Sequence, residues 1–133
     1  MADFKAVSID EVSGAQRFYK LIKNGRCQFD DFCSEIDTTY PYEKTAMFRS
    51  MDCLANGESL PKTKFHPWKL PKSGLKTFEL KTRHLRIYMA EIGGGKLVVL
   101  GGYKNGQAKD GFRFASLMKE YEQHLNTSRN GKK

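Results

Sequence analysis

The stretch FELKTRHLRIYMAEIGGGKLVVLGGYKNG, residues 78–106, decides the fold. Apolar and polar residues alternate through 76–81, and a second β-favouring run covers 85–92. Glycines at 93–95 close a hairpin between this run and the next. The continuous apolar run 96–103 suits the centre of a sheet. The stretch therefore predicts an antiparallel meander of three strands.

The flanking sequence adds one strand and three helices. RFYKLIK, residues 17–23, is followed at once by Asn24-Gly25, which predicts a strand and a turn. Three further runs place apolar residues at helical spacing, at residues 27–36, 43–56 and 112–125. The order is strand, helix, helix, strand, strand, strand, helix. We predict an α+β domain, with a small antiparallel sheet and helices packed on one face.

The remaining segments are connections and ends. Residues 60–74 hold three of the four prolines, which predicts a stiff, exposed, basic connection without a regular ladder. Residues 1–16 are either an N-terminal arm or an extra short strand. The domain proper spans 17–125, and a disordered basic tail is expected over 126–133.

Composition narrows the class of partner. The net charge is +8 and the sequence pI is about 9.4. This surplus favours a polyanion such as nucleic acid, a ribosomal surface or an acidic protein, although a basic surface can also serve solubility alone. Three cysteines without metal-ligand spacing predict neither a disulfide framework nor a zinc site. With no secretory signal and no membrane-spanning run, the expected location is cytoplasmic, without a membrane partner.

Familiar catalytic motifs are missing. GGGK lies between two predicted strands and lacks the spacing of a phosphate-binding loop. HExxH and GxSxG do not occur. Most acidic residues of 30–37 are expected on the solvent-exposed face of a helix, which disfavours a nuclease built on clustered carboxylates. No metal and no cofactor are expected.

Basic residues are the remaining candidates for chemistry. They gather around the predicted meander, at Lys69, Lys72, Lys81, Arg83, Arg86, Lys104 and Lys109. Cleaving RNA without a metal requires deprotonating the 2′-oxygen, stabilising the phosphorane and protonating the leaving oxygen. Fixed cations supply the second requirement, and Tyr88 or Tyr103 can stack on a base. His66 and His84 flank the sheet, as functional groups or as solvated surface.

Together these elements resemble RelE/HigB-type toxins of bacterial toxin–antitoxin systems, and the phage-derived HigB-like branch most closely. Phe78-Glu79-Leu80-Lys81 matches the family's first element, and Leu85-Arg86-Ile87-Tyr88 matches the second. The run 96–102 with Tyr103-Lys104 matches the last strand and the loop after it. Upstream, residues 17–36 resemble the first strand and helix of the family.

The resemblance implies a function and a set of site residues. Family members are typically metal-independent endoribonucleases that cut mRNA, many of them on the ribosome, and each is neutralised by a cognate antitoxin. The antitoxin expected here has an acidic or amphipathic contact segment. Arg86 matches the arginine that binds the scissile phosphate, and the other implied catalytic residues are Lys81, Tyr103 and Lys104. The implied RNA-binding residues are Lys69, Lys72, Arg83, His84, Tyr88 and Lys109.

The sequence departs from the family pattern at several positions. Gly101 stands where the family usually has a histidine, Thr77 and Glu79 stand where the RelE branch has a basic pair, and the loop 104–111 is poorer in lysine than is usual. Two alternatives to the ribonuclease therefore stay open. One is a non-catalytic module of the same fold that binds RNA or an acidic protein, and the other is a gyrase inhibitor of the ParE type.

Overall fold

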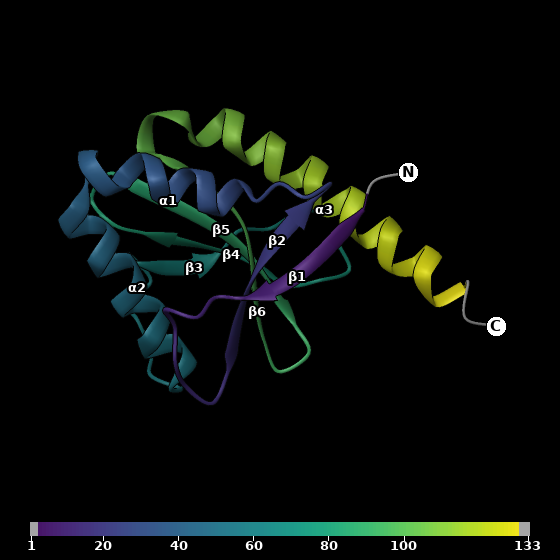
Figure 1. Ribbon diagram of the computed structural model, residues 1–133, viewed down its shortest axis with the longest axis horizontal. Coiled ribbons are helices and arrows are strands. Elements are labelled where there is room, and N and C mark those ends of the chain that lie inside the picture. Colours follow the sequence, from purple (N-terminus) through teal and green to yellow (C-terminus); the bar gives the residue numbers. More distant parts are fainter. Residues whose placement is uncertain (1–2, 131–133) are drawn as a thin grey trace.

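The chain folds as an α+β domain around one six-stranded sheet. A computed structural model describes residues 3–130, with side chains to residue 127. The strands lie in the order β1-β2-β6-β5-β4-β3 (Figure 1). The elements are β1 (Phe4–Ser8), β2 (Arg17–Lys23), α1 (Gln28–Thr39), α2 (Pro41–Ala55), β3 (Phe65–Pro67), β4 (Thr77–Lys81), β5 (Leu85–Ile92), β6 (Gly95–Tyr103), a 3-10 turn η1 (Lys104–Gly106) and α3 (Gln107–Asn130).

The predicted meander forms, but the sheet is mixed. Strands β4, β5 and β6 pair in antiparallel fashion, as the alternation and the glycine turn predict. Strand β2 pairs with β6 in parallel, so the prediction of a purely antiparallel sheet was wrong. The chain between this parallel pair runs through α1, α2 and strands β3, β4 and β5, which is far longer than the minimum that a parallel connection needs. Strand β3 occupies the edge beside β4, where a proline at its end costs no central ladder bond.

Helices cover both faces of the sheet. One core cluster joins α1 and α2 to the sheet through Phe29, Ile36 and Met47. A second cluster, on the other face, contains Phe114 and Met118 of α3. The prediction that all helices pack on one face was therefore wrong for α3. Because β6 lies between the two clusters, its side chains are buried on both faces, which explains the continuous apolar run.

The two ends of the chain carry more regular structure than the sequence indicated. Within the first sixteen residues, β1 pairs with β2, and residues 1 and 2 lie outside the described part. Helix α3 begins at Gln107 and continues to Asn130, so the expected disorder was wrong for residues 126–130. The helix extends past the sheet (Figure 1). The rest of the expected tail, 131–133, lies outside the described residues.

Over residues 3–130, none of the helices combines the length and the apolar character needed to cross a bilayer.

Candidate functional site

Most of the predicted site residues meet at one end of the sheet. Strand β4 ends at Lys81 and β5 begins at Leu85, directly beside the end of β6. Lys81 pairs with Arg86, and Leu85 pairs with Tyr103. The backbone N–H of Lys104 donates to the carbonyl of His84 at 2.9 Å. We call residues 81–86 together with Tyr103 and Lys104 the turn end of the sheet.

The turn end carries exposed positive charge. Arg83 and Lys104 are exposed, and the backbone of Lys104 bonds to that of His84, the residue after Arg83. Lys109 is exposed in the first turns of α3, soon after η1. Within the described part of the chain, none of these three has a carboxylate within 4 Å, whereas Lys20, Lys23 and Lys44 are each paired with one. The charge at the turn end is therefore available to an anionic partner.

Arg86 belongs to the interior rather than to an open basic face. Only 5% of the residue is exposed. One guanidinium nitrogen donates to the carbonyl oxygens of Thr82 and Leu85, at 2.7 and 2.8 Å. These bonds hold the β4–β5 turn closed. Direct phosphate binding by Arg86 is consequently not available in this conformation.

Two buried carboxylates, those of Glu79 and Asp110, lie on the same face of the sheet as Arg86. Glu79 is 1% exposed, accepts a hydrogen bond from Gln107 at 2.7 Å and lies 3.0 Å from His66. The carboxylate of Asp110 sits on Gly102, the residue paired with Arg86, and a Cβ there would overlap it. Burial raises the pKa of Asp110, although Arg113 and Lys109 oppose this. The prediction of an open basic face that continues across Lys81 and Arg86 was therefore wrong.

Tyr103 lies on the opposite face from Lys81 and Arg86. Its ring packs against Phe32 and Tyr40 at centroid distances of 5.7 and 6.0 Å, and its hydroxyl donates to Glu35. Burial, reinforced by the Glu35 hydrogen bond, raises the pKa of Tyr103. The prediction that Tyr103 lies beside Lys81 and Arg86 was wrong, and its hydroxyl stays protonated at neutral pH.

Tyr88 is fully buried between Trp68 and Phe114. Burial, together with the nearby charge of Glu79, raises the pKa of its hydroxyl. A ring without an exposed face cannot stack on a base, so Tyr88 is removed from the candidate interface.

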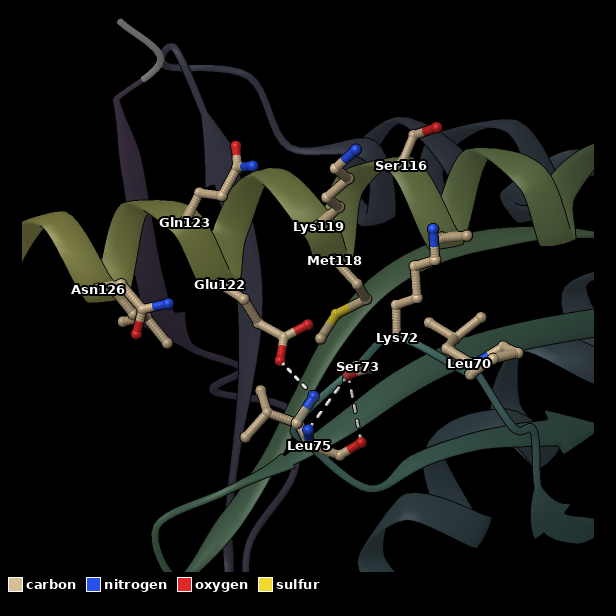
Figure 2. Close-up of a pocket in the computed structure, with 14 residues that line it drawn as sticks. Leu70, Lys72, Ser73, Leu75, Ser116, Met118, Lys119, Glu122, Gln123 and Asn126 are labelled. Carbon is tan, nitrogen blue, oxygen red and sulfur yellow. Dashed lines mark hydrogen bonds between the residues drawn. The ribbon is translucent and has the colours of Figure 1, made fainter.

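Lys69 and Lys72 lie away from the turn end. They belong to the loop before β4, near the start of that strand rather than its end. Lys72 lines a largely apolar groove of about 860 Å³ between this loop and residues 115–126 of α3. Figure 2 shows that Met118 points from α3 toward the loop. Glu122 of α3 accepts a hydrogen bond from the backbone N–H of Gly74 in this loop at 2.7 Å. These two lysines therefore do not join the turn-end site.

Three residues at the turn end were missed in the sequence. Glu43 of α2 contacts His84, the ring of Tyr40 packs at a tilt against the His84 ring, and Glu35 of α1 accepts from Tyr103. Each contact joins residues about 40 or more positions apart, so no local pattern indicates it. Within residues 3–130, no group of three or more His, Cys, Asp or Glu side chains is placed to hold a metal ion.

Comparison with known proteins gave no match to a family model, to a curated protein or to a solved structure.

Proposed function

We propose that the protein is a metal-independent endoribonuclease of the RelE/HigB type, the toxin of a toxin–antitoxin pair. The observation that carries the proposal is the turn end of the sheet. There Arg83 precedes the exposed His84 in the chain, and the backbone of Lys104 bonds to that of His84; both cations are exposed, and neither has a carboxylate partner among the described residues. Fixed cations of this kind stabilise the extra negative charge of a phosphorane.

The chain connectivity supports the same proposal. With β1 and β3 set aside, β2 to α3 run in the order strand, helix, helix, strand, strand, strand, helix. Two helices, α1 and α2, pack on one face of the sheet, as in the family that the sequence resembles. The net charge of +8 suits an RNA substrate.

Purified full-length protein tests the proposal against single-stranded RNA in the presence of EDTA. We expect cleavage, with products that carry a 2′,3′-cyclic phosphate and a 5′-hydroxyl. The double variant Arg83→Gln/Lys104→Gln should lose roughly tenfold or more of the rate, because two charges near the phosphorane are removed. The control variant Lys5→Gln/Arg17→Gln also removes two positive charges. Both positions are exposed, and they lie on β1 and β2, on the other side of β6 from β5 and β4.

Three outcomes would count against a ribonuclease. RNA binding without cleavage would indicate a non-catalytic binding module. The absence of both binding and cleavage would reject RNA as the substrate. Intact RNA together with inhibited DNA gyrase would favour the ParE type.

A further inference from the structure

His84 has the arrangement of an oriented proton acceptor. Its side chain is 46% exposed at the turn end of the sheet. Its ring Nδ1 lies 2.6 Å from Oε2 of Glu43. The other carboxylate oxygen of Glu43 accepts from the backbone N–H of His84 at 2.8 Å and from the hydroxyl of Thr82. Glu43 thus fixes both the backbone and the ring of the histidine.

The protonation of Glu43 determines which ring nitrogen is available. Burial alone would raise the pKa of Glu43, but hydrogen bonds from Thr82 and His84 together lower it. Glu43 is therefore ionised at neutral pH and can only accept hydrogen bonds. Nδ1 of His84 carries the proton in this contact, and in the neutral ring the Nε2 lone pair is free. Among the described residues, none hydrogen-bonds to Nε2.

Tyr40 limits rotation of the imidazole. The ring centroids of Tyr40 and His84 lie 5.0 Å apart, and the ring planes are tilted by 31°. The ring of Tyr40 also packs against that of Tyr103, at a centroid distance of 6.0 Å. Tyr103 cannot take the same role as His84, because its hydroxyl is bound to Glu35 and its pKa is raised by burial and by that hydrogen bond. Of the two side chains, His84 is the one with a ring nitrogen, Nε2, that no described residue occupies.

Position 101 leaves no room for a histidine. A Cβ built on Gly101 would overlap the ring of Phe32, which packs from α1 onto β6. A larger side chain would displace Phe32 from the core. The acid–base group of this chain therefore has to come from elsewhere.

We infer that His84 is the general base of the RNA cleavage, with Glu43 as its positioning residue. The inference rests on the proposed ribonuclease function. Nε2 of His84 takes the proton from the 2′-hydroxyl, and the 2′-oxygen forms a bond to phosphorus. The bond from phosphorus to the 5′-oxygen breaks, and that oxygen takes a proton from water. The His84 proton then returns to solvent, leaving a 2′,3′-cyclic phosphate and a 5′-hydroxyl.

Kinetics of His84→Gln test the general base. Removing a general base typically costs about 10²–10⁴ in rate, so we expect kcat to fall by about a hundredfold or more with KM nearly unchanged. The matched control is His124→Gln, at a half-buried histidine on α3. Added imidazole should restore part of the activity to His84→Ala and none to the Arg83→Gln/Lys104→Gln variant. If the wild-type protein cleaves RNA and His84→Gln cleaves it equally fast, the inference is wrong, although the proposed ribonuclease function would still stand.

Spectroscopy tests the arrangement independently of cleavage. Nitrogen-15 spectra of the imidazole should show the proton on Nδ1 of His84 in the neutral ring. Glu43→Gln should weaken that preference and lower kcat with little change in KM, which a merely structural role would not do. A proton on Nε2 in the wild-type protein would overturn the inference even if RNA is cleaved. If the wild-type protein cleaves no RNA, the proposed function and this inference fall together.

Discussion

Arg86 shows how a strand arginine can serve the fold instead of a ligand. Its guanidinium binds two carbonyl oxygens of the turn that carries Arg83 and His84. The guanidinium Nε is buried without a partner within the described chain. Arg86 thus contributes to the turn-end site indirectly, by holding the backbone on which the exposed residues stand.

Replacing Arg86 should therefore affect stability first. In Arg86→Ala the carbonyl oxygens of Thr82 and Leu85 lose their donor. We expect the free energy of unfolding to fall by about 2–3 kcal/mol, since charged hydrogen bonds contribute this order of energy. Urea denaturation measures the change, and exposed Arg83→Ala is the control, expected within about 0.5 kcal/mol of wild type. Lost cleavage with unchanged stability would restore Arg86 as a phosphate ligand.

Glu43 should give the protein a measurable pH dependence. The pKa of Glu43 is lowered below its ordinary value of 4.5 in the fold. Its ionised form is thus favoured by folding, and the stability it contributes is complete above the unfolded pKa and disappears as the pH falls through the lowered pKa. Wild type should be more stable than Glu43→Gln at pH 7, and the difference should shrink in acid. A difference independent of pH would show that the carboxylate charge is not involved.

Among the elements, β6 connects the two halves of the fold. Gly101 on this strand faces Phe32 of α1, and Gly102 faces Asp110 of α3. Helices approach both faces of the strand closely because these positions lack a Cβ. The same strand leads from the core to Lys104 at the turn end, so its packing fixes where the exposed cations lie.

A histidine introduced at position 101 should destabilise this chain. Gly101→His would push Phe32 out of its contact with β6, and overpacking of a core commonly costs about 1–3 kcal/mol. We expect a lower melting temperature and no gain in cleavage. Increased cleavage at unchanged stability would mean that the α1 face accommodates an acid–base group at position 101.

The sequence predicted the helices and strands better than it predicted the contacts between them. Local alternation and glycine turns were sufficient for β4, β5 and β6, and helical spacing was sufficient for α1 and α2. The face occupied by Tyr103 was mispredicted because strand positions 102 and 103 point to opposite sides, so that Tyr103 shares the face of Leu85 and not of Arg86. The contact between Glu43 and His84 depends on where α2 docks, which no local pattern encodes.

At the scale of the whole molecule, the exposed cations of the turn end are where we expect the proposed RNA substrate to bind. The net charge is +8, but part of it is paired along α1 and α3. RNA affinity should weaken with salt, because each neutralised phosphate releases counterions. Arg83→Gln should reduce the slope of log affinity against log salt by about 0.7, whereas Arg17→Gln should leave it unchanged. A slope equally affected by both variants would indicate diffuse attraction without a defined site.

The location of RNA on the protein is the most direct test of the central claim. Amide nitrogen-15 spectra of the full chain, titrated with a short RNA made uncleavable by 2′-O-methylation, report which residues meet the ligand. We predict the largest shifts at residues 82–84 and 103–105, with smaller ones at the start of α2. Shifts that instead follow β1 or the groove between residues 70–75 and α3, with the turn end unmoved, would contradict the proposed site.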